Sequence, residues 1–237
     1  MKSIFLADAH LRDPQDQAYR DLLTFLQKLP DDLDNLFILG DFFDFWHGYQ
    51  NVVFNAYIPI LATLEKLSGK GIKIYFFAGN HEISWGPYLK QIGLCYNRET
   101  TIDLDGQKIY LAHGDHLNPD DHIYRLWSAV LRHPWTLRII NNLPSSLAWK
   151  IADRLSRRSR RYTGSEKIIP TQVLASCAKL LKGNITAMII GHFHQARQEI
   201  FITVNGPKTL YILGDWINDR SYINLEDGQF SFHNFRQ

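Results

Sequence analysis

Residues 73–82 read KIYFFAGNHE, an apolar run that passes directly into glycine, asparagine, histidine and glutamate. The run 73–77 is rich in aromatic and β-branched residues, which predicts a short buried strand. Asn80 and His81 follow that strand at once, where polar side chains contribute little to packing. Their place at the end of a strand therefore indicates a binding or catalytic role.

The same arrangement recurs at four other points along the chain. Apolar runs predict further buried strands at residues 3–7, 35–39, 107–111 and 187–190. Side chains able to bind a metal follow these runs: Asp8 and His10, then Asp41, then His113, then His192 and His194. Each taken alone has an ordinary explanation, such as a turn or a surface histidine. Their recurrence at five strand ends indicates a shared site, because open α/β sheets bind ligands at the carboxyl ends of strands.

The segments between these strands predict the architecture. Helical patterns at 19–29 and 55–67 separate the first three strands, and such alternation predicts a largely parallel sheet covered on both faces. Residues 119–170 break the alternation and read as a helical insertion over the strand ends. After His194, runs at 199–204, 209–213 and 229–235 predict antiparallel strands that close a second sheet. We expect one α/β domain, 1–237, that contains the insertion.

Composition narrows the class of protein. The chain is 45% hydrophobic and 21% charged, with a formal net charge of +2, which gives no case for nucleic-acid binding over the whole surface. Its two cysteines, Cys95 and Cys177, are too few for a secreted disulfide scaffold and favour reduced thiols in a cytoplasm. No apolar run reaches the roughly 18 residues of a membrane-spanning helix, and Asp8 interrupts the short apolar start of the chain.

The residue types at the strand ends point to metal chemistry. Oxygen ligands mixed with imidazoles suit first-row divalent metals, including manganese, iron and zinc. A carboxylate such as Asp41 can bridge two ions, and two ions about 3.5–4 Å apart clamp the attacking and leaving oxygens of a phosphoryl transfer. They also lower the pKa of bound water, so no protein nucleophile is needed. The sequence has no Gly-x-Ser-x-Gly elbow and no phosphate-binding Gly-rich loop.

Taken together, the strand-end residues resemble the five motifs of the calcineurin-like metallophosphoesterases. The motifs are Asp8-x-His10, Gly40-Asp41-x-x-Asp44, Gly79-Asn80-His81-Glu82, His113-Gly114-Asp115 and Gly191-His192-x-His194. The resemblance implies a four-layer α/β/β/α sandwich. It also implies one ion held by Asp8, His10, Asp41 and His194, and a second held by Asp41, Asn80, His113 and His192. It further implies that Asp44 orients His81, which stabilises the transition state or protonates the leaving group.

Within that class, the chain resembles the UDP-2,3-diacylglucosamine hydrolases of lipid A synthesis. His113-Gly114-Asp115 is followed by Asp120-Asp121-x-x-Tyr124, the insertion ends in a basic stretch, and Leu213-Gly214-Asp215-Trp216 follows the last histidine pair. The resemblance implies hydrolysis of UDP-2,3-diacylglucosamine to UMP and 2,3-diacylglucosamine 1-phosphate, with two divalent ions, manganese first and iron or zinc as alternatives. It implies substrate contacts by Asn80, His81, Asp121, Tyr124, Ser159, Thr163, Lys167 and His192.

One departure from the family pattern leaves the substrate open. Well-known members carry arginine after the metal-binding asparagine, where this chain has His81, and that arginine touches the substrate phosphates. Another nucleotide-sugar or lipid pyrophosphate, or a simpler phosphodiester, is therefore an alternative substrate. A non-catalytic binding scaffold on the same fold is a further alternative, but loss of metal ligands would mark such a scaffold and this chain retains the full set.

The insertion gives a separate indication of a lipid substrate. At roughly 100° per residue, Leu147, Ile151 and Leu155 form one apolar stripe of a helix. A basic stripe lies beside it, formed by Lys150, Arg154, Arg157, Arg158 and Arg161. Such a helix can lie on an anionic membrane or hold acyl chains beside phosphates, whereas the alternative is a core-packed helix with a solvated basic face. With the resemblance added, we expect a cytoplasmic protein, peripheral on the inner face of the cytoplasmic membrane, with no nucleic-acid partner and no obligate protein partner.

Overall fold

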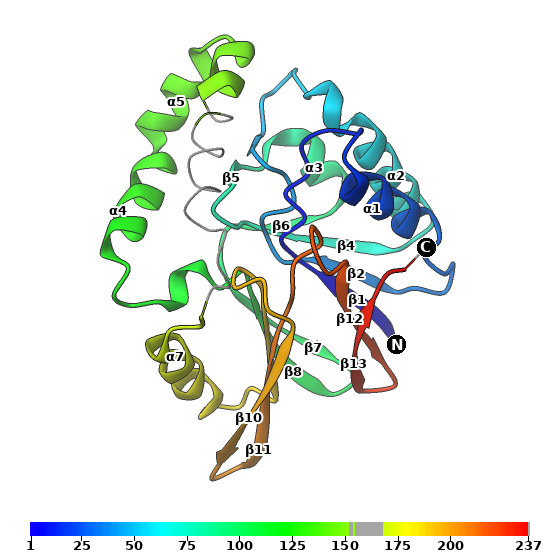
Figure 1. The fold of residues 1–237 in the computed structure, drawn as a ribbon, viewed down its shortest axis with the longest axis vertical. Coiled ribbons are helices and arrows are strands. Elements are labelled where there is room, and N and C mark those ends of the chain that lie inside the picture. The colour runs from blue at the N-terminus through cyan, green and yellow to red at the C-terminus, as the bar shows by residue number, and fades with distance from the viewer. Residues whose placement is uncertain (152–153, 155–167, 237) are drawn as a thin grey trace.

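Two β-sheets packed face to face form the centre of the protein (Figure 1). The computed structural model describes residues 1–151, 154 and 168–236. The first sheet has the strand order β13-β12-β1-β2-β4-β6. Its strands are β1 (Lys2–Leu6), β2 (Asn35–Ile38), β4 (Lys73–Phe77), β6 (Leu94–Tyr96), β12 (Ser221–Glu226) and β13 (Gln229–Asn234). Strands β1, β2, β4 and β6 are parallel, and β12 pairs antiparallel with β1.

The second sheet has the strand order β10-β11-β9-β8-β7. Its strands are β7 (Thr100–Leu104), β8 (Gln107–Ala112), β9 (Ala187–Ile190), β10 (Arg197–Thr203) and β11 (Gly206–Ile212). The three central strands are parallel, and an antiparallel partner flanks them at each edge. A separate two-stranded pair joins β3 (Trp46–His47) to β5 (Glu82–Ser84).

Helices cover the outer face of each sheet and complete four layers. The first sheet carries α1 (Gln17–Gln27), the short 3-10 helix η1 (Asn55–Tyr57), α2 (Ile58–Gly69) and α3 (Gly86–Ile92). The second sheet carries η2 (Asp115–Leu117) and α7 (Thr171–Leu181). Apolar cores fill the space under each helical layer and between the sheets. The α/β/β/α sandwich that the resemblance implied is therefore confirmed.

Alternation along the central strands explains this layering. In β1, Phe5 faces the core between the sheets, while its neighbours Ile4 and Leu6 face the helices. Phe5 stacks on Phe37 of β2 with ring centroids 4.6 Å apart, and Phe37 stacks on Tyr75 of β4 at 4.4 Å. Because each buried aromatic side chain stabilises the fold by about 2 kcal/mol, this row joins three strands whose ends carry the candidate site.

Two sequence expectations about the sheets are wrong. The sequence leaves open the sheet of the last two of the five predicted strands, and the structure pairs β8 with β9 in the second sheet. The run 229–235 belongs to the first sheet, where β13 pairs with β12, a strand that the sequence did not reveal. In β12 only alternate residues such as Ile223 and Leu225 enter the core, so polar Asn224 breaks the apolar pattern. The run 209–213 was also expected to be antiparallel. As β11 it pairs antiparallel with β10 but parallel with β9.

Helices also occupy the region of the predicted insertion and stand along one edge of the molecule (Figure 1). They are α4 (His122–Leu131) and α5 (Pro134–Asn142), followed by a helical stretch at 145–151. Neither α4 nor α5 contains a buried residue. Among the described residues, no helix combines the length and apolar character needed to cross a membrane. Leu155, Arg157, Arg158 and Arg161 lie outside the described residues.

Candidate metal centre

The ends of five strands bring the predicted ligands into one buried cluster. The strands are β1, β2, β4, β8 and β9, and main-chain hydrogen bonds tie their loops together: Asp8 N–H donates to the Gly40 carbonyl and His10 N–H to the Asp41 carbonyl. Gly79 allows the closest approach, because a Cβ atom there would lie 2.2 Å from Oδ1 of Asp41. The predicted convergence of these residues at the carboxyl ends of the strands is therefore present in the structure.

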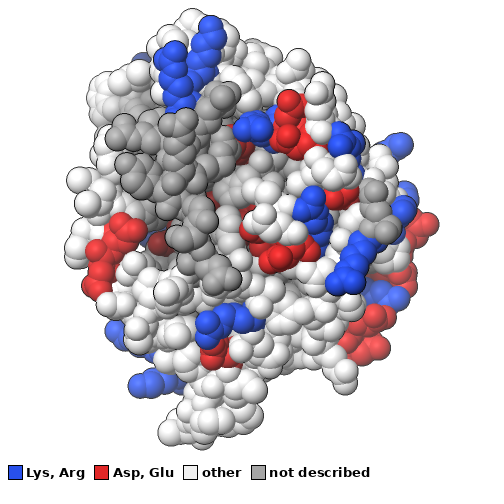
Figure 2. Space-filling model, in the orientation of Figure 1, with Lys and Arg blue, Asp and Glu red and all other residues white. Residues whose placement is uncertain are grey.

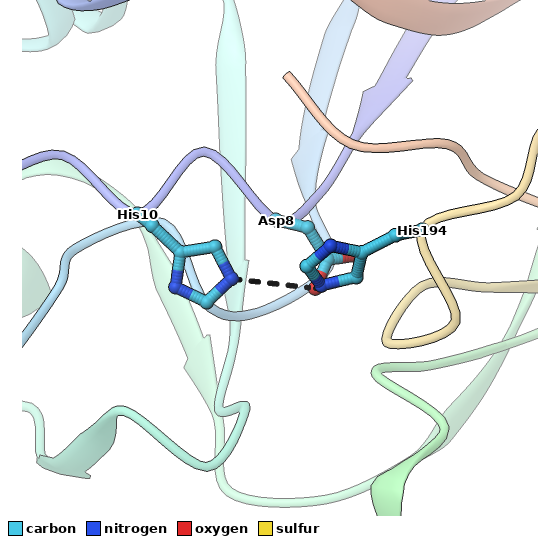
Figure 3. Close-up of side chains that lie close together, drawn as sticks. All are labelled: Asp8, His10 and His194. Carbon is cyan, nitrogen blue, oxygen red and sulfur yellow. Dashed lines mark ion pairs between the residues drawn. The ribbon is translucent and has the colours of Figure 1, made fainter. Parts of the chain in front are cut away.

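One group of side chains surrounds Asp8 (Figure 3). The imidazoles of His10 and His194 both point toward its carboxylate and come from different loops. Nε2 of His194 lies 3.2 Å from Oδ1 of Asp8, and Nε2 of His10 lies 3.9 Å from the same oxygen. His10 also lies 3.8 Å from Oδ2 of Asp41, which connects this group to the next.

A second group consists of Asp41, His113 and His192. Nε2 of His113 lies 3.5 Å from Oδ2 of Asp41 and 3.2 Å from Nδ1 of His192. Within each group, one potential ligand atom per residue lies within 4.8 Å of the others. Asp41 belongs to the second group and also lies close to His10 of the first, which is the position that a bridging carboxylate would occupy.

Buried atoms of the cluster fit metal coordination. Oδ1 of Asp8, Nε2 of His10 and Oδ1 of Asn80 are buried, and within the described part of the chain none of them makes a hydrogen bond of good geometry, although His194 lies near Oδ1 of Asp8. Such atoms are costly to bury unless something binds them, and a divalent cation accepts electron pairs from all three. Burial lowers the pKa of His10 to about 4, so its imidazole is neutral and its lone pair is available to a metal.

The backbone of the cluster is strained. Five of the expected ligands have positive φ: Asp8 (54°), His10 (43°), Asp41 (47°), His192 (72°) and His194 (56°). Left-handed conformations cost residues other than glycine on the order of 1 kcal/mol each, and they gather at functional sites. The strain turns neighbouring side chains toward one point.

Other groups orient the imidazoles from behind. Nδ1 of His113 donates to the Leu39 carbonyl at 2.8 Å, which turns its Nε2 toward Asp41. Burial alone would lower the pKa of His113, but the carboxylates of Asp41, Asp8 and Asp115 together outweigh it, Asp41 most of all, and the pKa rises to about 10. Nδ1 of His194 lies 3.3 Å from Oδ2 of Asp215. Contacts of this kind fix the ring and the tautomer of a metal-binding histidine.

His81 and Asp44 are neighbours, as the resemblance implied, and the His81 ring bonds to the Asp44 main chain. Nδ1 of His81 donates to the Asp44 carbonyl at 2.6 Å, and the Asp44 carboxylate lies in one group with His81 and His10. Nε2 of His81 is 3.9 Å from Oδ2 of Asp41. Burial would lower the pKa of His81, but the charges of Asp41, Glu82 and Asp44 and the bond to the Asp44 carbonyl together outweigh it, so the pKa is raised.

The expected substrate contacts outside the cluster make bonds within the protein. Asp121 caps α4 by accepting the Tyr124 N–H at 2.9 Å. The Tyr124 hydroxyl donates to the Asp115 carboxylate, and its ring lies 6.5 Å from that of His192. Ser159, Thr163 and Lys167 lie outside the described residues.

Sequence reasoning missed three residues that hold the site. Glu82 is buried and accepts main-chain N–H groups from Asp41, Phe42 and Gly79 at 3.0, 3.0 and 2.9 Å. Glu82 and Asp215 both stand in the family motifs, so their proximity to ligands was a usable signal. Arg132 belongs to no motif, and only the structure places it against the Gly79–Glu82 loop.

A cleft of about 1080 Å³ adjoins the cluster at His113. It opens between α4 and the segment that runs from β5 to β6. Its basic lining residues are Lys90, Arg98, Arg125 and Arg132. A cleft of this size with several cations suits a phosphorylated ligand larger than inorganic phosphate.

Comparisons with known proteins agree with this geometry. The family model described as calcineurin-like phosphoesterase matches residues 1–196. The UDP-2,3-diacylglucosamine hydrolase of Haemophilus ducreyi is 32% identical over 239 residues, covering 98% of this chain and 99% of the relative. The enzyme of that name from Aliivibrio fischeri is 27% identical over 238 residues, with 98% of each chain covered. A solved archaeal phosphodiesterase shares the fold, with a TM-score of 0.52, 13% identity and 99% of each chain covered.

Proposed function

The chain belongs to the calcineurin-like phosphoesterases, hydrolases of phosphate esters, and we propose that it cleaves the pyrophosphate bond of UDP-2,3-diacylglucosamine. The products are UMP and 2,3-diacylglucosamine 1-phosphate. The observation that carries this proposal is the joint presence of two ligand groups around Asp41 and of near full-length relatives named for that reaction.

The family implies divalent metal ions, and we assign them to the two groups. Asp8, His10, Asp41 and His194 hold one ion, while Asp41, Asn80, His113 and His192 hold the other. Manganese is our first choice, because carboxylate, amide and imidazole ligands suit it, as they do iron and zinc. When bound, such ions supply Lewis acidity to the phosphate and acidify water at neutral pH.

His81 is the chain's own contribution to the chemical step in this proposal. Its Nδ1 is occupied by the Asp44 carbonyl, which leaves Nε2 directed to the cluster side near Asp41. The raised pKa favours the protonated ring, and a proton held there would stabilise charge on the phosphate or pass to the leaving group. The basic lining of the cleft, including Arg98 and Arg125, complements the negative diphosphate.

The surface of α4 supports a lipid-linked substrate. Ile123, Leu126, Trp127 and Val130 follow i, i+3, i+4, i+7 spacing, and the first three are 74%, 67% and 61% exposed. Such a stripe is rare on the surface of a soluble monomer and is typical of contact with lipid or a partner. We therefore propose that this face meets the membrane or the acyl chains, at the inner face of the cytoplasmic membrane.

The stretch 145–151 bears on the two interpretations of the predicted apolar stripe. Trp149 packs on Phe54 with ring centroids 4.4 Å apart, so the buried side of the helix lies there. Leu147 and Ile151 are exposed, which supports the lipid-facing interpretation over the core-packed one. Among the described residues, basic and acidic side chains are interspersed over the face drawn in Figure 2.

The substrate is tested with purified protein and Mn²⁺ on three compounds: UDP-2,3-diacylglucosamine, unacylated UDP-N-acetylglucosamine and bis(p-nitrophenyl) phosphate. We expect release of UMP from the lipid-linked compound with the highest kcat/KM. Faster hydrolysis of either soluble compound would overturn the substrate assignment and favour a simpler phosphoester.

Membrane association is tested by sedimentation with anionic and neutral vesicles. Ile123→Asn should weaken binding to anionic vesicles, while Ile202→Asn, on the 84% exposed isoleucine of β10, should not. Raising the salt concentration should also weaken binding, because surface charges are screened. Equal effects of the two substitutions would remove α4 from the contact.

A further inference from the structure

Arg132, directly after α4, contacts the loop that carries Asn80 and His81. Its Nη2 donates to the main-chain carbonyl of Gly79 and, at 3.3 Å, to that of Glu82. Its Nη1 donates to the Ser128 hydroxyl at 2.8 Å, one helical turn earlier. The two carbonyls bracket Asn80 and His81, so one side chain of the predicted insertion spans the loop from its first residue to its last.

The opposite side of this loop is held from inside the protein. The buried carboxylate of Glu82 accepts N–H groups from both Gly79 and Asp41, which joins the two ligand-bearing loops. The N–H of His81 donates to Oδ1 of Asp41 at 3.0 Å. The loop therefore lies between the buried carboxylate of Glu82 and the guanidinium of Arg132. Among the described residues, Arg132 is the charged side chain that holds the loop from the α4 side.

Asn80 depends on this backbone restraint. Its Oδ1, the expected ligand atom, is buried and has no hydrogen-bond partner among the described residues, so its position depends on the backbone of the loop. Hydrogen bonds from a guanidinium are stronger than those between neutral groups, and the two N–H bonds of Nη2 can serve both carbonyls while Nη1 holds Ser128. Removal of the guanidinium would leave two partly buried carbonyls without their donor and free the loop to shift.

We propose that Arg132 is a positioning residue through which α4 fixes Asn80 and His81 relative to Asp41. The inference rests on the proposed metal centre and is independent of which phosphoester is cleaved. It assigns the predicted insertion a second task besides contact with lipid, since the helix that faces the lipid also holds a ligand-bearing loop.

The experiment compares Arg132→Ala and Arg132→Lys with Arg138→Ala, which removes an exposed guanidinium from α5. Mn²⁺ affinity is measured by equilibrium dialysis, and kcat and KM are measured on bis(p-nitrophenyl) phosphate and on UDP-2,3-diacylglucosamine. Arg132→Ala should weaken Mn²⁺ binding and lower kcat on both substrates by about 10- to 100-fold, the usual effect of losing a group that orients a ligand. Arg132→Lys should recover part of both losses, and Arg138→Ala should match the wild type.

Unchanged Mn²⁺ affinity and unchanged kcat on the soluble diester in Arg132→Ala would overturn the proposal. A rise in KM for the lipid-linked substrate would not rescue it, because Arg132 would then be a substrate contact only. If circular dichroism shows that the alanine variant does not fold, Arg132→Gln is judged by the same criteria. A wild-type protein that binds Mn²⁺ but cleaves neither compound would refute the proposed function, and the dialysis results would still decide the role of Arg132.

Discussion

Asp215 and His194 face each other across 3.3 Å, from Oδ2 of the carboxylate to Nδ1 of the ring, on the side of the imidazole away from Asp8. Asp215 also accepts the N–H of Asn218 at 2.6 Å, so its carboxylate is itself held in place. Behind a metal-binding histidine, such a carboxylate fixes the ring and raises its basicity.

Asp215→Asn should therefore weaken Mn²⁺ binding by about 10- to 100-fold, because the ring loses a charged partner while the shape of the site is kept. Equilibrium dialysis measures the affinity, and Asp219→Asn, four residues further on an exposed loop, is the matched control. Equal affinities for the Asp215 variant and the wild type would show that Asp215 serves the fold of the loop alone.

Asp41→Ala should lower activity by a factor of about 100 or more and reduce the metal content of the purified protein. The reason is that Asp41 stands between the two ligand groups, so its loss weakens both sites together. Metal analysis and phosphodiester turnover are measured on the same sample, with Asp103→Ala on an exposed position of β7 as control. Full activity with unchanged metal content would end the assignment.

His81→Ala should lower kcat by about 100-fold and leave the metal content unchanged, because His81 is assigned to proton transfer and not to metal binding. Asp44→Asn should lower kcat less, since the carbonyl that accepts from Nδ1 of His81 remains. His81→Arg should restore part of the rate on a diphosphate substrate, because arginine presents a fork to phosphate oxygens. Loss of metal in step with activity in His81→Ala would make the residue structural.

Cys177 should react slowly with thiol reagents in the native protein. Burial on the inner face of α7 raises the pKa of its thiol to about 12, so very little of the reactive thiolate is present at pH 8. Burial likewise raises the pKa of Cys95 to about 12. Labelling with a maleimide, followed by mass spectrometry, should be slow for both thiols at pH 8 and fast in denaturant. Fast native labelling of Cys177 would show that α7 opens readily.

Much of the candidate site was predictable because each strand end carries its own local signal. An apolar run of four or five residues, followed by Asp, Asn or His, locates one ligand without knowledge of the others. The pairing of strands carries no such signal: β8 and β9 look like β4 in sequence, yet they form the second sheet. β12 was missed because polar Asn224 interrupts its apolar residues.

Contacts between distant segments could not be predicted either, because they also leave no local signal in the sequence. Nothing near Arg132 indicates that it reaches a loop about fifty residues earlier in the chain. Asp44 was expected to orient His81, and a motif cannot reveal that the main-chain carbonyl of Asp44 accepts the bond. A motif gives the identity of each side chain. Whether a main-chain or a side-chain group accepts a hydrogen bond depends on the backbone conformation of the loop.

The positive φ angles at Asp8, His10, Asp41, His192 and His194 have a consequence for metal selection. We expect folding to bear the cost of this strain, so that capture of an ion would require little rearrangement. In such a preorganised cage, one divalent ion would replace another with little movement of the loops. Because affinity would then follow the intrinsic order of the metals, the ion found in the living cell would be decided as much by supply as by the protein.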